Sequence, residues 1–174
     1  MKFFKRFFFL FISPAICVFG LDFHSKMLAQ KLVNSHEFGF GTFMYAKNYG
    51  AILGLYSDVP KFIFIISLST IAVFLLCLAF TIFYFLPRTL IAAPLGLSLL
   101  ISGILGNAFD RFQNGFVTDF LAFHIGSKST PYMNIADLAQ WVGYILLLYA
   151  LTIGATKIWR PDNSRKRLIV NKAF

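Results

Sequence analysis

Four long, charge-free apolar runs alternate with polar segments along this chain. The last three runs are close to or longer than the ~20 residues that a helix needs to cross the hydrocarbon core of a membrane. Pro60 and Pro87 bracket the second run, where prolines favour helix boundaries. The pattern predicts transmembrane helices at about 7–22, 62–87, 89–109 and 138–157.

The first run admits a second interpretation. Lys2, Lys5 and Arg6 followed by a short apolar stretch also describe a secretory signal peptide. The run is rich in phenylalanine, and Ser13-Pro14-Ala15 is only a poor match to a cleavage site. Because Lys5 and Arg6 can snorkel to the membrane surface, a short helix can still span. We therefore expect the first helix to be retained.

Composition supports a membrane protein and excludes the other broad classes. Of the 174 residues, 58% are hydrophobic and 13% are charged, against about 45–50% and about 25% in soluble domains. A soluble chain of this length could not bury so much apolar surface, and a disordered chain would be less hydrophobic. Cys17 and Cys77 both lie in apolar runs, where we expect small buried hydrophobic residues rather than a disulfide.

The net charge of +9 is distributed unevenly between the two sides that four helices would create. The side that holds both termini has ten basic residues: Lys2, Lys5, Arg6, Arg88, Lys157, Arg160, Arg165, Lys166, Arg167 and Lys172. The other side has six: Lys26, Lys31, Lys47, Lys61, Arg111 and Lys128. The positive-inside rule therefore places both termini in the cytoplasm, and the basic tail is a topology signal rather than a nucleic-acid surface.

The two segments predicted outside the membrane, about 23–61 and 110–137, carry strand patterns. Glu37–Lys47 is rich in glycine and aromatic residues, as strands often are. In the second segment, an Asn114-Gly115 turn signal precedes the apolar run Phe116–Phe123. The expected fold is a mainly α membrane protein of four transmembrane helices with a small extracytoplasmic β platform.

Six of the seven acidic residues fall on the outer side or at its membrane edge, and two of them stand out. Asp119 is the only charge in an apolar octet, and Asp137 lies where the last charge-free run begins. Two carboxylates held together share a proton, so that one acts as a base toward water and the other as an acid. Structural interpretations are equally open: Asn134 as a helix N-cap, Asp137 facing the helix dipole, and Asp119 or Asp110 paired with Arg111.

Other kinds of site find little support in the sequence. His24, His36 and His124 lack the spacing of metal ligands. Ser102 lies in an apolar helix rather than at a strand-turn-helix elbow, so a serine nucleophile is not expected.

Five blocks of sequence occur in a characteristic order: Leu21–Lys26, Tyr45–Ala51, Gly106–Arg111, Gly115–Phe120 and Asn134–Asp137. They resemble the blocks of the lipoprotein signal peptidases, or signal peptidases II, which are bacterial aspartyl endopeptidases of the inner membrane. The resemblance covers nearly the whole chain. Ser102, Thr118 and Ile52–Leu53 depart from the usual residues, which bears on packing or substrate fit and removes no carboxylate.

The resemblance implies an enzyme that cleaves diacylglyceryl-modified prolipoproteins before the lipidated cysteine. It implies that Asp119 and Asp137 form a water-activating dyad. The supporting residues it implies are Asn107, Arg111 and Asn134 for holding substrate backbone and dyad, Asp110 for bracing Arg111, and Asn48 and Asp22 as further support. It also implies no metal or organic cofactor, sensitivity to the cyclic peptide globomycin, and a site at the extracytoplasmic face of the bacterial cytoplasmic membrane. We expect the chain to act as a monomer.

Two other classes of function remain as alternatives. A transporter subunit or assembly factor would place acids along an ion path in mid-helix, but the last three predicted helices have none there. A membrane hydrolase of lipid phosphates would need clustered Arg, His and Ser on one face, but the outer side offers only Arg111 and scattered histidines.

Overall fold

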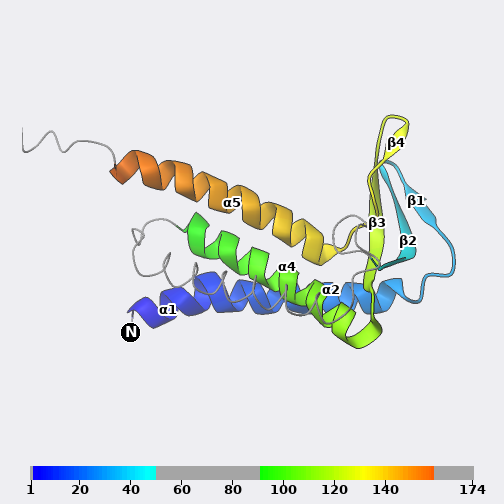
Figure 1. The fold of residues 1–174 in the computed structure, drawn as a ribbon, viewed down its shortest axis with the longest axis horizontal. Helices are drawn as coiled ribbons and strands as arrows, with labels where there is room; N and C mark the ends of the chain where they lie inside the picture. The colour runs from blue at the N-terminus through cyan, green and yellow to red at the C-terminus, as the bar shows by residue number, and fades with distance from the viewer. Residues whose placement is uncertain (1, 50–90, 159–174) are drawn as a thin grey trace, which may run out of the picture.

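The computed structural model describes residues 2–49 and 91–158 of the chain. The predicted helix at 62–87, the first residues of the one at 89–109, Cys77 and the basic C-terminal tail lie outside the described residues. Three described helices are long and apolar enough to cross a membrane, namely Phe4–Ala29, Ala92–Asn114 and Ile135–Ile153. The protein is therefore a membrane protein whose described residues form three apolar helices and a small antiparallel sheet (Figure 1). The predicted helix at 62–87 and the side of the membrane on which the termini lie stay predictions.

The N-terminal helix is continuous but changes its winding. It comprises α1 (Lys2–Phe7), a π-helical segment η1 (Phe8–Ile12) and α2 (Ser13–Ala29). Pro14 lies in the first turn of α2. A proline lacks the N–H for a helical bond and its ring clashes with the carbonyl four residues earlier, so a wider turn just before it relieves the clash. Cys17 is free, as expected, but exposed rather than buried.

All three described helices are longer at the sheet end than predicted. The first continues to Ala29 instead of ending near 22, α4 spans Ala92–Asn114 instead of ending at 109, and α5 (Ile135–Ile158) begins three residues before 138. The predicted ends were placed at the first charged residues. The helices continue because these charges are partnered inside the bundle: Lys26 pairs with Asp22 and Asp110, and Asp137 accepts hydrogen bonds from amides.

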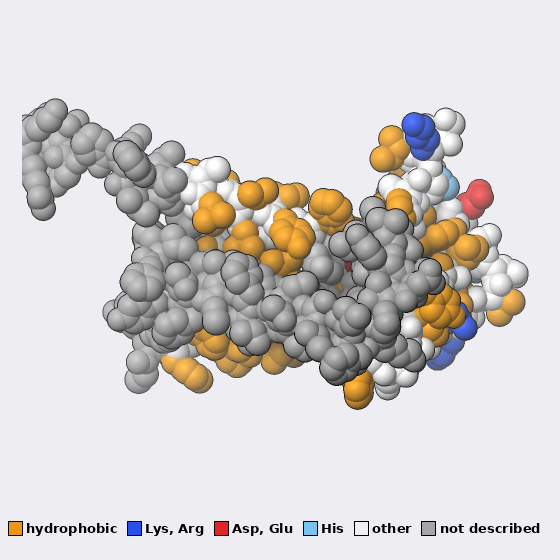
Figure 2. Space-filling model, in the orientation of Figure 1, with side chains coloured by type: hydrophobic (Ala, Val, Ile, Leu, Met, Phe, Trp, Pro, Cys, Tyr) orange, Lys and Arg blue, Asp and Glu red, His pale blue; other side chains and the backbone are white. Residues whose placement is uncertain are grey.

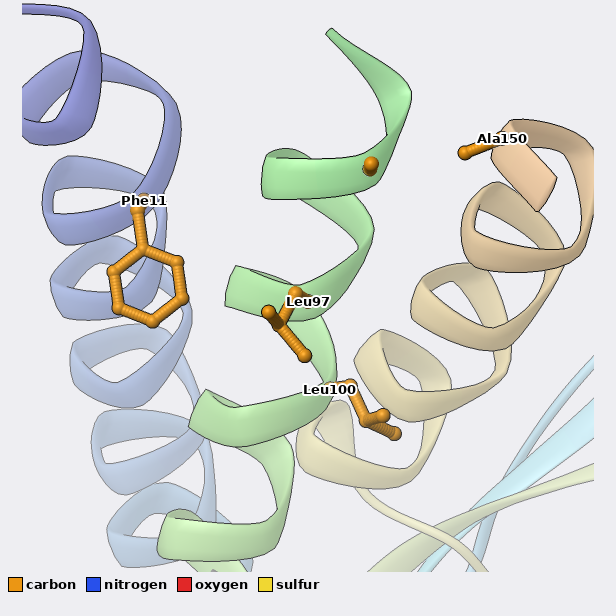
Figure 3. Packing of buried hydrophobic residues seen from close by; sticks show 5 residues of the cluster. Phe11, Leu97, Leu100 and Ala150 are labelled. Atoms are coloured by element: carbon orange, nitrogen blue, oxygen red, sulfur yellow. The ribbon is translucent and has the colours of Figure 1, made fainter. Parts of the chain in front are cut away.

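The helices pack closely along small residues. A Cβ added at Gly96 of α4 would lie 2.9 Å from the Gly143 carbonyl oxygen of α5, and one at Gly143 would lie 2.7 Å from the Gly96 oxygen. Such contacts let helix backbones approach in a membrane. Phe11, Leu97 and Leu100 belong to the apolar core of the helices, shown in Figure 3. Ser98 Oγ donates a 2.6 Å hydrogen bond to the Phe11 carbonyl and ties α4 to the first helix.

The predicted β platform is present as a four-stranded antiparallel sheet in the order β1-β2-β3-β4. Its strands are β1 (His36–Phe38), β2 (Gly41–Asn48), β3 (Val117–Ile125) and β4 (Lys128–Ser129). The sheet stands across one end of the helices (Figure 1). The chain turns at the predicted Asn114-Gly115 signal: Gly115, with φ of 80°, ends α4 in the left-handed conformation that glycine adopts at helix C-termini, and β3 follows.

A bulge in β2 determines which residues face the same way as Asp119. Phe43 lies opposite Leu121 and Ala46 lies opposite Asp119, so two residues of β2 stand against one of β3. Opposed residues share a face of the sheet, and side chains alternate along a strand. Beyond the bulge, Asn48 therefore lies on the Asp119 face. Without it, Lys47 would take that place.

Hydrophobic side chains cover the visible sides of the helices. On the face shown in Figure 2 they also occur around the sheet, and the visible coloured Lys, Arg, Asp and Glu atoms gather at that end. Trp141, Ile145 and Leu148 of α5 are more than half exposed, as expected for side chains that contact lipid. The apolar exposed surface of the helices suits the hydrocarbon layer of a membrane, and the sheet suits the polar surface of that layer.

Candidate active site

Asp119 and Asp137 come from different elements and meet through one residue. Asp119 lies on β3 and is 2% exposed. Asp137 lies in the first turn of α5. Asn134 Nδ2 donates to Asp119 Oδ1 at 2.7 Å, and the Asn134 backbone N–H donates to Asp137 Oδ2 at 3.1 Å. A single asparagine therefore bridges the two carboxylates.

The same asparagine begins helix α5. Asn134 Oδ1 accepts a 2.9 Å hydrogen bond from the Asp137 backbone N–H. Together with the bond from the Asn134 N–H to Asp137, this forms a reciprocal capping box. Asp22 of α2 caps the next free donor, since its Oδ1 accepts from the Ala136 N–H at 2.8 Å. These three hydrogen bonds fix the start of α5, and they thereby fix the position of Asp137.

Asn107 of α4 holds Asp137 from the opposite side. Its Nδ2 donates to Asp137 Oδ1 at 2.8 Å. Its Oδ1 accepts from Asn134 Nδ2 at 3.0 Å and from Lys26 Nζ at 2.9 Å. Both oxygens of Asp137 thus have amide donors, and the network runs from α2 through α4 to α5.

Asp119 is buried and held between two amides. Besides the bond from Asn134, its Oδ2 accepts a 2.9 Å hydrogen bond from Asn48 Nδ2. Burial raises the pKa of Asp119 to about 6, and the negative charge of Asp137 adds to this, while the amides of Asn48 and Asn134 and the charge of Lys26 act in the opposite direction. The carboxyl is therefore poised to exchange a proton near neutral pH.

Arg111 and Asp110 occupy the last turns of α4, beside the dyad. Arg111 lies within electrostatic reach of Asp119 and Asp137. Its Nη1 donates to the Asn107 carbonyl at 3.5 Å. Asp110 Oδ2 accepts from the Thr118 N–H at 2.8 Å, and Oδ1 accepts from Asn114 Nδ2 at 3.1 Å, so Asp110 anchors the start of β3 to α4. Whether it also braces Arg111 stays a prediction.

The structure brings the eight predicted site residues to one end of the bundle, beneath the sheet. They are Asp22, Asn48, Asn107, Asp110, Arg111, Asn134, Asp119 and Asp137. The structure places these residues together, and their roles in catalysis stay proposals.

Two buried residues of the network were not among the predicted site residues. Lys26 was counted as a basic residue of the outer loop, but it is 3% exposed and forms a 2.7 Å salt bridge with Asp22. Their i,i+4 spacing is the signal that could have revealed the pair. Thr118, which replaces a usual valine, is fully buried, and its Oγ1 accepts from Gln30 Nε2 at 3.3 Å. Its carbonyl accepts from Asn134 Nδ2 at 3.2 Å.

Comparisons with known proteins agree on one family. The model of the family described as signal peptidase (SPase) II matches residues 14–153. The lipoprotein signal peptidase of Aquifex aeolicus is 36% identical over 141 residues, covering 80% of this chain and 83% of that protein. The one from Francisella tularensis subsp. novicida is 34% identical over 145 residues, covering 78% of this chain and 87% of that protein.

A solved structure has the same fold. It is a bacterial membrane enzyme determined by the in meso method at 2.3 Å resolution, and it superposes with a TM-score of 0.71 at 29% identity. The superposition covers 87% of this chain and 92% of the other.

Proposed function

Because the chain belongs to the signal peptidase II family, a family of peptidases that process prolipoproteins at the inner membrane, we propose that it cleaves diacylglyceryl-modified prolipoproteins before the lipidated cysteine. Asp119 and Asp137 act as the water-activating pair. The observation that carries the proposal is the bridge of Asn134 between two carboxylates from separate elements.

The environments of the two aspartates favour different roles. Asp119 is buried with a pKa of about 6, which suits a carboxyl that holds the shared proton. Asp137 lies at the N-terminus of α5, where the helix dipole stabilises negative charge, and amides donate to both of its oxygens. In this proposal Asp119 is the acid and Asp137 the base.

The reaction then proceeds without a covalent intermediate. Water attacks the scissile carbonyl carbon while Asp137 takes a proton from the water and Asp119 gives its proton to the carbonyl oxygen, forming a gem-diol. Asp137 next protonates the leaving nitrogen, Asp119 recovers a proton from a diol hydroxyl, and the C–N bond breaks. Both carboxyl groups return to their initial states. In this proposal Arg111 and Asn107, which contact each other next to the two aspartates, would hold the substrate backbone.

The position of the dyad suits a substrate anchored by lipid. The carboxylates lie where the apolar helices end and the sheet begins, close to the depth at which a diacylglyceryl chain enters the bilayer. With the unequal distribution of basic residues, this supports a site at the extracytoplasmic face. The sheet would then cover the peptide from above, and one copy of the chain would supply both aspartates.

The proposed activity is tested with purified protein and two matched prolipoproteins. One carries diacylglycerol on the cysteine and the other is unmodified. We expect cleavage of the lipidated substrate only, with mass spectrometry locating the new N-terminus at the lipidated cysteine, and inhibition by globomycin. Equal cleavage of both substrates, or a cut at another bond, would contradict the proposed specificity.

A further inference from the structure

Lys26 is a buried cation that the proposed chemistry leaves unused. It lies near the end of α2, and its side chain is 4% exposed. Its ammonium has three acceptors: Asp22 Oδ2 at 2.7 Å, Asn107 Oδ1 at 2.9 Å and Asp110 Oδ2 at 3.4 Å. A buried ammonium needs such partners, since leaving its charge and N–H groups unmatched is costly.

The contact with Asn107 has a consequence beyond charge neutralisation. An ammonium has no acceptor, so it selects the orientation of the Asn107 amide in which Oδ1 faces Lys26. In that orientation Nδ2 points to Asp137 Oδ1, 2.8 Å away. The flipped amide would set N–H groups against the ammonium and an oxygen against the carboxylate, which is unfavourable at both ends.

We propose that Lys26 is a positioning residue of the peptidase site, which acts through Asn107 to hold Asp137 in the orientation needed to activate water. Lys26 need not touch substrate or the reacting atoms for this role. Lys26 determines which way the Asn107 amide faces, and the Asn107 Nδ2 in turn holds Oδ1 of Asp137, the proposed base. The inference rests on the proposed function, because it assigns Lys26 to the same dyad.

A purely structural role makes a different prediction. If Lys26 only neutralised Asp22 and Asp110, its removal would lower the stability of the fold, and the effect on turnover would not depend on Asn107. If Lys26 acts through Asn107, the two residues are coupled in catalysis, and removing either one has much the same effect as removing both.

The test is a double-mutant cycle on turnover of a lipidated prolipoprotein. Wild type, Lys26→Met, Asn107→Ala and the double variant are purified, and kcat and KM are measured for each. We expect Lys26→Met to lower kcat by roughly 10²-fold with little change in KM, since a displaced catalytic group costs about this much. In the Asn107→Ala background, the same substitution should change kcat by no more than about twofold.

Two further variants serve as controls. Lys26→Arg keeps both the positive charge and donors toward Asn107, and it should restore part of the kcat lost in Lys26→Met. Lys31→Met removes an exposed lysine just beyond α2 and should leave kcat unchanged.

Lys26→Met leaves Asp22 and Asp110 without their shared cation and risks misfolding. The cycle is therefore repeated in an Asp22→Asn background, in which the side-chain oxygen can still accept from the Ala136 N–H and one unpaired charge is removed. A loss of kcat in Lys26→Met that is equally large without the Asn107 amide, or no loss at all, would overturn the proposal. If wild type itself failed to cleave the lipidated substrate, the proposed function would fall instead.

Discussion

Asn134 makes two kinds of contact with different atoms of the same side chain. Its Oδ1 caps α5, and its Nδ2 donates to Asp119. The N-cap interpretation of this residue is confirmed, and the role proposed for it between the aspartates uses the other end of the same amide, so the two interpretations are compatible. A polar residue at the start of a helix can both accept from a backbone N–H of the first turn and donate to a neighbouring carboxylate.

The two tasks of Asn134 can be separated by substitution. Asn134→Ser keeps a good N-cap acceptor, whereas Asn134→Ala loses it, which costs about 1 kcal/mol of stability. Neither residue can donate to Asp119 as the amide does. We expect thermal unfolding in detergent to show the serine variant as the more stable of the two, while both lose most cleavage activity. Full activity in either variant would contradict the bridging role of the amide.

The amide of Asn48 should control the pH dependence of cleavage. In wild type, kcat/KM should fall as the pH rises through about 6, where Asp119 loses its proton. The Asn48 amide stabilises the ionised carboxylate and so lowers the pKa of Asp119. Asn48→Ala should therefore raise that pKa and move the fall in kcat/KM to higher pH.

Gln30→Ala is the matched control for this pH profile, since its amide binds Thr118 and no carboxylate. Its profile should follow that of wild type. A fall in kcat/KM at lower pH for Asn48→Ala, or at the same pH as in wild type, would contradict the assignment of the proton to Asp119.

At the scale of elements, the ends of the helices were the part that the sequence predicted least well. Charge-free runs located the N-terminal helix, α4 and α5, but each predicted helix ended at or near the first charged residue. Asp22, Lys26 and Asp110 are buried because they pair with one another across α2 and α4. Such tertiary pairing cannot be read from a single run, although the i,i+4 spacing of Asp22 and Lys26 indicates it.

The sheet was predicted from alternation and aromatic content, but its register was not. The bulge between Phe43 and Ala46 depends on contacts with β3, so local sequence does not reveal it. The kind of turn at Gly115 was not predicted for a similar reason. An Asn-Gly pair is typical of hairpin turns, yet the same positive φ also ends a helix, and here the preceding residues are helical.

Close packing of α4 against α5 should be needed to keep Asp137 in place. In Gly96→Ala the new Cβ would lie 2.9 Å from both the Gly143 oxygen and Leu146 Cβ, so the helices must separate. We expect a loss of about 1–3 kcal/mol of stability, together with reduced cleavage. Gly20→Ala is the control, because nothing lies within 4 Å of its added Cβ, and it should be neutral in thermal unfolding and activity. Equal behaviour of the two variants would argue against a packing constraint.

For the whole molecule, the distribution of charge predicts orientation. Of the six basic residues counted on the outer side, Lys26 is buried and pairs with Asp22 and Asp110, so it contributes little to the outer loops. Leaving it out of the count increases the excess of basic residues on the side of the termini. The prediction that the termini lie in the cytoplasm is therefore unchanged.

A reporter fused after Phe174 tests this orientation. A reporter enzyme that works only in the cytoplasm should be active at this position, and a reporter enzyme that works only outside the cytoplasm should be inactive. The reverse result would place the termini outside and move the proposed site to the cytoplasmic face. Fusion of the same reporters between β3 and β4, at Gly126, provides the complementary position and should give the opposite pattern.

The most direct test of the account replaces each aspartate of the dyad with its neutral isostere. Asp119→Asn and Asp137→Asn are purified, checked for wild-type thermal unfolding behaviour, and assayed on a lipidated prolipoprotein beside Glu37→Gln, an exposed acid of β1. Both dyad variants should bind substrate but fail to cleave it, whereas Glu37→Gln should cleave like wild type. Cleavage at the wild-type rate by either folded dyad variant would contradict the two-aspartate mechanism.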